Sequence, residues 1–112
     1  MQYDTINKLN IVDENAGKLE PYFERCIVSN QIMNDNQTIG YIYREEPSED
    51  KDSGWHIMSG KETDEYFEDH NNLQYIAIGV LLNKDDSYIH LLNEPIGSEF
   101  ARDEITGTFF QL

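Results

Sequence analysis

The stretch between residues 38 and 66 constrains the fold of this chain more than any other part of the sequence. It contains two aromatic, strand-like segments, 38–44 and 55–58, joined by a loop rich in Glu, Asp, Ser, Pro and Gly. Alternation along the first segment places Tyr41 and Tyr43 on one face, because every second side chain of a strand points the same way. We therefore predict two strands with a solvated loop between them.

A hairpin is predicted just before this stretch. Residues 26–28 form a short apolar run, and the turn residues 34–36 indicate that this run pairs with 38–44. Cys26, the single cysteine of the chain, lies in the run. No histidine or helix N-terminus is evident near it, so we interpret it as a buried structural thiol rather than a nucleophile.

The second half of the chain mixes helix and strand signals. Thr63 is placed to cap a short acidic helix over residues 64–68. Residues 75–82 are the most apolar stretch and favour a strand buried on both faces, although a buried helix fits a run this short as well. Residues 97–102 are interpreted as a loop, and residues 105–110 as a final strand.

These elements predict an α+β fold: a single small domain over residues 1–112, with a mainly antiparallel sheet and one to three short helices. A chain of 112 residues is long enough for one core and too short for two. Residues 1–24 and 75–92 remain open between helical and extended structure.

Net charge limits the partners that such a chain can have. The formal charge is −14, from 22 acidic and 8 basic residues. Phosphates would repel it, which argues against nucleic acid and anionic membranes as partners. A basic protein partner is favoured, although the same charge also suits plain solubility. No signal-peptide pattern and no membrane-length apolar run is visible, so we expect a cytoplasmic protein.

Residues for catalysis or metal binding do not gather in the sequence. His56, His70 and His90 are too widely spaced for a zinc site, and no calcium loop is complete. The adjacent carboxylates at 45–46 and 64–65 lie in polar surroundings, where a solvated face is favoured over an acid–base pair. We therefore predict a protein that is not an enzyme and uses no cofactor and no metal.

Aromatic residues beside carboxylates suit a surface that binds a basic partner, since rings give contact area at little entropic cost and carboxylates create a long-range field. The predicted partner-binding residues are Tyr41, Tyr43, Glu45, Glu46, Asp50, Asp52, Glu62, Asp64 and Glu65. The predicted structural residues are Gly40, Arg44, Gly54, Trp55, Ser59, Gly60, Pro95 and Gly97. Within this second set, Trp55 is interpreted as core, and Arg44 is expected to pair with a carboxylate of a neighbouring element.

An ordered series of short motifs adds a resemblance. The motifs are Cys26-Ile27-Val28-Ser29-Asn30, Gly40-Tyr41-Ile42-Tyr43-Arg44-Glu45-Glu46-Pro47, Asp52-Ser53-Gly54-Trp55, Ser59-Gly60-Lys61-Glu62, Asp64-Glu65-Tyr66, Asn71-Asn72, and Leu91-Leu92 through Pro95-Ile96-Gly97-Ser98-Glu99-Phe100-Ala101-Arg102. Together they resemble the bacterial family numbered thirty-three among the immunity proteins of polymorphic toxin systems, also catalogued as a domain of unknown function. The resemblance covers about residues 26–103. The chain departs from the family's usual pattern at His56-Ile57-Met58 and at Lys61, and residues 73–90 match loosely.

This resemblance implies a binding function without chemistry of its own. An immunity protein binds its cognate toxin and blocks it by occlusion, so an acidic face would oppose a basic toxin surface, such as that of a nuclease. The alternative is a small housekeeping or regulatory domain without a toxin partner. An enzyme that uses a carboxylate pair is the third and weakest hypothesis.

Overall fold

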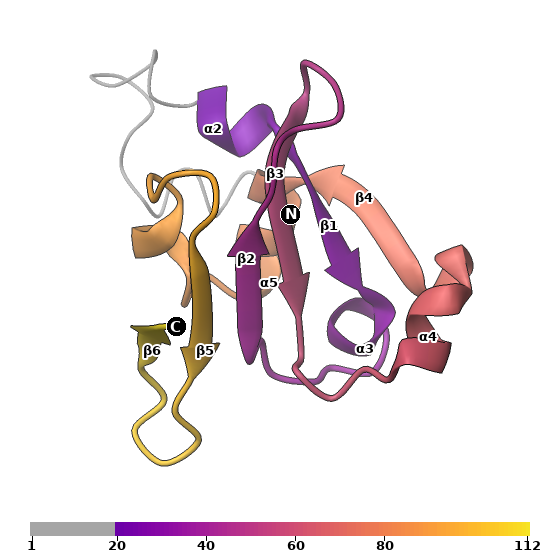
Figure 1. Ribbon diagram of the computed structural model, residues 1–112, viewed down its shortest axis with the longest axis vertical. Coiled ribbons are helices and arrows are strands. Elements are labelled where there is room, and N and C mark those ends of the chain that lie inside the picture. Colours follow the sequence, from indigo (N-terminus) through magenta and orange to yellow (C-terminus); the bar gives the residue numbers. More distant parts are fainter. Residues whose placement is uncertain (1–19) are drawn as a thin grey trace.

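Six strands form one sheet in the computed structural model, which describes residues 20–112 (Figure 1). Their order across the sheet is β4, β1, β3, β2, β5, β6. The strands are β1 (Arg25–Ser29), β2 (Tyr41–Arg44), β3 (Asp52–Met58), β4 (Leu73–Ala77), β5 (Glu99–Arg102) and β6 (Phe109–Gln111). The neighbours β1 and β3 run parallel, and the other pairs are antiparallel. The predicted α+β fold with a mainly antiparallel sheet is confirmed.

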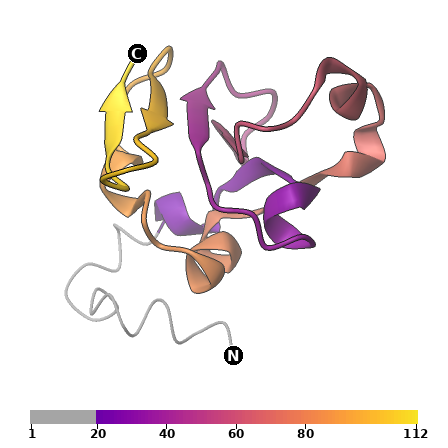
Figure 2. The same cartoon turned by 90° about the horizontal axis from the view of Figure 1, so that it is seen from below.

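Short helical segments connect the strands. They are α2 (Glu20–Phe23), α3 (Asn30–Met33), α4 (Asp64–Glu68) and α5 (Ile78–Lys84), with the 3-10 turns η2 (His70–Asn72) and η3 (Ile89–Leu91). The acidic helix α4 begins as predicted, because the Thr63 hydroxyl accepts a hydrogen bond from the Tyr66 amide at 3.1 Å. In Figure 2, α5 lies on one side of the strands and α4 toward the other.

The hydrophobic core lies between one face of the sheet and the segments α3, α5 and η3. Alternate strand residues supply the sheet side of this core: Cys26, Val28, Ile42, Trp55, Ile57 and Phe100. Trp55 is 1% exposed, as its interpretation as a core residue requires. Cys26 is fully buried, and burial raises the pKa of its thiol to about 12, so it carries no thiolate at neutral pH.

The predicted hairpin between residues 26–28 and 38–44 is wrong. Strand β1 pairs with β3 and β4, and β3 separates it from β2. The connecting residues do not make a tight turn, because Ser29 caps α3 by accepting a hydrogen bond from the Gln31 amide at 3.1 Å. This helical turn carries the chain past β3, so the sheet acquires its parallel pair.

Residues 97–102 are not a loop, because β5 occupies Glu99–Arg102 and pairs with β2. The alternation is short, but it buries Phe100 in the core and leaves both of its neighbours half-buried. The final strand is shorter than predicted, since Ile105 lies in a turn and is 95% exposed. Asp103 closes that turn by accepting hydrogen bonds from the amides of Ile105 and Thr106.

The apolar stretch 75–82 is divided between a strand and a helix. Strand β4 ends at Ala77, opposite Arg25 at the start of β1, so a longer strand would have no partner there. The chain then turns into α5, whose Ile78 amide donates to the Glu24 carbonyl at 2.8 Å. The predicted strand is therefore correct up to Ala77 and wrong beyond it. The alternatives for residues 1–19 lie outside the described part of the chain.

Candidate functional site

The sheet face opposite the core gathers aromatic side chains over β2 and β3. We call it the open face, and it comprises the side chains that strand pairing places around the two predicted contact tyrosines: Tyr41, Tyr43, His56, Met58, Glu99 and Ala101. The Tyr43 ring stacks on His56 with centroids 4.6 Å apart and lies 5.4 Å from the Tyr41 ring. The three rings therefore form one continuous row across two strands.

Hydrogen bonding fixes the outer end of this row. The Tyr41 hydroxyl donates to the Glu99 carboxylate of β5. Partial burial and this hydrogen bond raise the pKa of Tyr41 to about 12, and burial together with Glu45 also raises the pKa of Tyr43. Both phenols are therefore neutral at physiological pH, so they present rings and hydroxyl groups rather than charges.

His56 ties the aromatic row to the acidic loop. Its Nε2 atom lies 3.1 Å from a carboxylate oxygen of Glu45, whose side chain is 62% exposed. Burial lowers the pKa of His56, although the charges of Glu45 and Asp52 act in the opposite direction. Sequence reasoning treated His56 as one of three unrelated histidines and did not include it among contact residues. Its alternation with Trp55 and Ile57 was the signal that puts it on the open face.

A groove of about 510 Å³ adjoins this face. We call it the aromatic groove, and its lining residues come from β2, the end of β3, α4 and β5: Gly40, Tyr41, Tyr43, Met58, Gly60, Glu62, Phe67 and Ala101. Phe67 reaches it from α4, a helix that sequence reasoning identified without assigning its ring to a site. The groove thus joins strand and helix residues that lie far apart in the sequence.

Five of the predicted contact carboxylates are exposed. They fall on the connection from β2 to β3 and in the first turn of α4: Glu45, Glu46, Asp50, Asp64 and Glu65. The other two, Asp52 and Glu62, hold the protein's own backbone.

Asp52 is the first residue of β3, and it is 6% exposed. Its two oxygens accept hydrogen bonds from the Gly54 amide at 2.8 Å and from the Ser48 amide at 2.9 Å. These hydrogen bonds outweigh the effect of burial and lower the pKa of Asp52. The carboxylate therefore closes the turn that leads into β3, and both of its oxygens are engaged within the protein.

Glu62 closes the turn at the other end of β3 in the same way. Its carboxylate accepts hydrogen bonds from the Ser59 amide at 2.8 Å and the Gly60 amide at 3.0 Å. Burial opposes ionisation, but hydrogen bonds from Ser29 and Ser59 outweigh it and lower the pKa of Glu62. Glu62 is therefore an ionised wall of the aromatic groove whose position is fixed by the turn it closes.

Arg44 lies on the core side of β2, as alternation predicts, but its expected carboxylate partner is not what it binds. Its guanidinium donates to the Ser53 carbonyl at 2.9 Å and the Glu94 carbonyl at 2.8 Å. It also lies over the Trp55 ring, 5.5 Å from the centroid. Carbonyl oxygens replace the carboxylate because β3 and the connection that leads to β5 each place a backbone carbonyl beside the guanidinium.

Glycines make two close approaches possible. A Cβ atom on Gly40 would lie 2.3 Å from the Ser59 carbonyl oxygen, and one on Gly54 would lie 2.0 Å from the Glu45 carbonyl oxygen. Gly54 also has a φ of 86°, at the irregularity where β1 and β3 shift register. The predicted structural residue Gly97 donates its amide to the Arg44 carbonyl at 2.8 Å.

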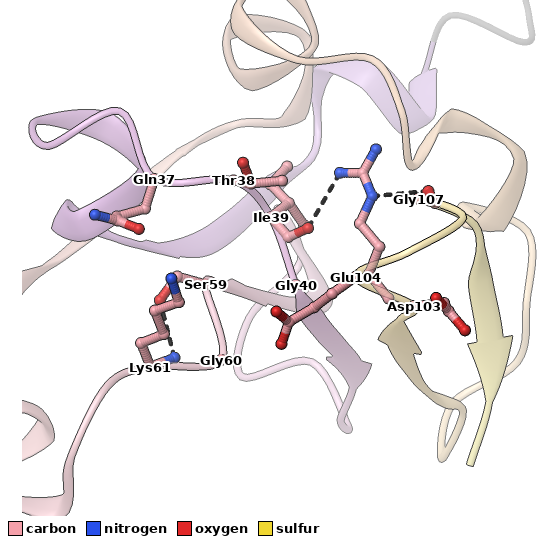
Figure 3. Close-up of a pocket in the computed structure, with 11 residues that line it drawn as sticks. Gln37, Thr38, Ile39, Gly40, Ser59, Gly60, Lys61, Asp103, Glu104 and Gly107 are labelled. Carbon is pink, nitrogen blue, oxygen red and sulfur yellow. Dashed lines mark hydrogen bonds between the residues drawn. The ribbon is translucent and has the colours of Figure 1, made fainter.

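A second hollow of about 480 Å³ lies between the segment before β2, the turn after β3 and the hairpin of β5 and β6 (Figure 3). Lys61 lies on one side, and Asp103 and Glu104 lie on the other. Arg102 closes it by donating to the carbonyls of Ile39 at 3.1 Å and Gly107 at 2.8 Å. The bond to Gly107 stabilises the hairpin between β5 and β6, and the bond to Ile39 ties this hairpin to the segment before β2.

Two kinds of site are absent from the described residues. Between residues 20 and 112, no three His, Cys, Asp or Glu side chains gather in a way that could hold a metal ion. Within the same range, none of the helices has the length and apolar character needed to cross a bilayer.

Residues 26–112 match the family described as the immunity protein Imm33 domain. This chain belongs to the Imm33 family. The match begins at Cys26 and continues to the last residue, so it includes the whole open face. Searches of curated proteins and of solved structures gave no match.

Membership assigns this Imm33 domain an immunity-protein role, and with it a toxin as the general class of partner. Two of the motifs on which the family resemblance rested stabilise the fold here. Asp52, Gly54, Trp55, Ser59 and Glu62 build the two ends of β3 and the core beneath it. They therefore form the support on which Tyr41 and Tyr43 are displayed.

Proposed function

We propose that this Imm33 domain binds its toxin through the open face and blocks it by covering a basic surface of the toxin. The observation that carries the proposal is the continuous row of Tyr41, Tyr43 and His56, half-buried on the sheet face opposite the core. Side chains that only support the fold would pack into the core, whereas these three rings pack on one another.

Rigid rings favour binding because they lose little conformational freedom when a partner covers them. Tyr43 contacts the rings of Tyr41 and His56, and the Tyr41 hydroxyl donates to Glu99. Such pre-organised tyrosines are typical binding hot spots, whose truncation costs about 2 kcal/mol or more in affinity.

Charge supports a basic surface as the target. Glu45, Glu46 and Asp50 are exposed on the connection that follows β2, and Asp64 and Glu65 are exposed in α4. A toxin that binds phosphates, for example a nuclease, has a basic active site that these carboxylates would oppose. The net charge of −14 extends the same field over the whole molecule.

The test needs the cognate toxin, which a pull-down with the purified protein from the source bacterium's lysate would identify. Its affinity for the purified protein is measured by titration, and its toxic activity is measured with and without the protein. Tyr43→Ala should weaken binding about 30-fold or more, and Glu46→Lys rather less, because rim charges contribute less than buried anchors.

The matched control is Phe23→Ala. Phe23 is an aromatic residue of α2 that is 61% exposed and lies outside the open face. Its truncation should leave the affinity unchanged, and thermal melts should show that each variant stays folded. If Tyr43→Ala and Glu46→Lys bind the toxin as tightly as wild type, the open face is not the contact surface.

A further inference from the structure

We propose that the aromatic groove binds the side chain of an arginine presented by the partner. This inference rests on the proposed function, because it names the group that the open face recognises. It concerns the groove residues Tyr41, Tyr43 and Phe67, with Glu62 and Glu99 as the nearby charges.

The walls of the groove have the chemistry that a guanidinium requires. Tyr41 and Tyr43 present rings from β2, and Phe67 presents a third ring from α4. A planar cation binds such ring faces through their quadrupole and stacks on them through its flat surface. Met58, which is 3% exposed, and Ala101 add apolar contact for the methylene groups of the arginine stem.

Two carboxylates supply the opposite charge. Glu62 is an ionised wall of the groove, fixed by the amides of Ser59 and Gly60. Glu99 accepts the Tyr41 hydroxyl from β5, beside Tyr43. A carboxylate has about four lone-pair positions, so Glu99, which accepts the Tyr41 hydroxyl, retains acceptor capacity for the N–H groups of a guanidinium. Glu62 already accepts hydrogen bonds from Ser29, Ser59 and Gly60, so it contributes its negative charge.

The fold already uses this interaction elsewhere. The chain has three arginines, and each lies over an aromatic ring: Arg25 over Tyr75, Arg44 over Trp55, and Arg102 over Phe109, at 5.0 to 5.6 Å from the centroids. The rings of Tyr41, Tyr43 and Phe67 therefore have no arginine of the chain over them. An arginine is favoured over a lysine because the ammonium group is more strongly hydrated and has no flat face.

The probe is N-acetyl-arginine amide, titrated into the full-length protein and followed by NMR chemical shifts. N-acetyl-citrulline amide is the matched control, because it has nearly the same shape without the charge. The arginine probe should shift resonances of Tyr41, Tyr43 and Phe67 with millimolar affinity, and the citrulline probe should bind about fivefold more weakly or not at all.

Variants locate the site. Glu99→Gln keeps the shape of the side chain and should weaken the arginine probe about threefold, because only the charge is lost. Tyr43→Leu should weaken it further. Tyr75→Leu is the control, since Tyr75 is an exposed tyrosine of β4 outside the groove that already has Arg25 over its ring. Thermal melts separate loss of binding from loss of fold, and Glu99→Gln serves as the test if Tyr43→Leu unfolds.

Three results would overturn the inference: no shift with the arginine probe, equal shifts with citrulline, or shifts that map outside the groove. None of them depends on the toxin. If the probe fails while Tyr43→Ala still abolishes toxin binding, the arginine site is wrong and the proposed function stands. If the probe binds the groove but every open-face variant binds the toxin with unchanged affinity, the groove is a cation site and the proposed interface is wrong.

Discussion

Along β2, alternate side chains have different roles: those on the core side stabilise the fold, and those on the other side form the open face. Ile42 points into the core, and Arg44 binds carbonyls on the same side. Tyr41 and Tyr43, which alternate with these two residues, face outward, and their ring centroids lie 5.4 Å apart. A change on the first side should therefore be measured as a loss of stability, and a change on the second side as a loss of binding.

Gly54 offers the sharpest stability test, with Gly97 as its matched control. Both have positive φ, 86° and 97°, but a Cβ on Gly54 would lie 2.0 Å from the Glu45 carbonyl oxygen, whereas a Cβ on Gly97 meets nothing within 4 Å. We expect Gly97→Ala to cost about 1–2 kcal/mol through backbone strain alone. Gly54→Ala should cost more than about 4 kcal/mol in urea unfolding. Equal losses would show that the steric contact is relieved without cost.

His56 should make stability depend on pH. Its folded pKa lies below the ordinary value of 6.5, so the unfolded chain binds the proton more readily than the folded chain. This contribution to stability is present above pH 6.5 and is lost as the pH falls through the folded pKa. We expect His56→Gln to flatten the dependence of melting temperature on pH just below 6.5. If the melting temperatures of wild type and variant change equally with pH over this range, His56 is not the source of the pH dependence.

Among the elements, helix α4 forms one wall of the aromatic groove, yet it is short and exposed. Its first turn depends on the Thr63 hydroxyl, which accepts the Tyr66 amide at 3.1 Å. Thr63→Ala should destabilise the helix by about 1 kcal/mol and speed hydrogen exchange at the Tyr66 amide. Thr63→Ser keeps the hydroxyl and should exchange like wild type. If the alanine variant exchanges no faster, the cap does not hold α4.

Local signals predicted the elements that local chemistry decides. The cap at Thr63, the outward tyrosines of β2 and the buried Trp55 follow from residue type and spacing. Strand β5 was missed because Glu99–Arg102 is extended only through its pairing with β2, far away in the sequence. The site was predictable only in part for the same reason, since strand order brings His56 and Glu99 to the tyrosines and the packing of α4 brings Phe67.

At the scale of the whole molecule, the net charge of −14 should act on the rate of association more than on the fold. Raising salt to about 0.5 M shortens the Debye length to roughly 4 Å, so attraction to a basic toxin should be screened and association should slow. Glu45→Gln combined with Glu46→Gln should reduce this salt dependence in stopped-flow or surface-binding measurements. An association rate that does not change with salt concentration would show that electrostatic steering does not contribute.

The parallel pair of β1 and β3 sets the order in which a newly made chain can fold. Strand β1 leaves the ribosome first among the described strands, but its neighbours β3 and β4 begin only at Asp52 and Leu73. At ordinary rates of translation, β1 waits about 2 to 10 seconds for β4. The open face is finished later still, when β5 pairs with β2. A chain that stops before Glu99 therefore lacks both β5 residues of the open face, Glu99 and Ala101.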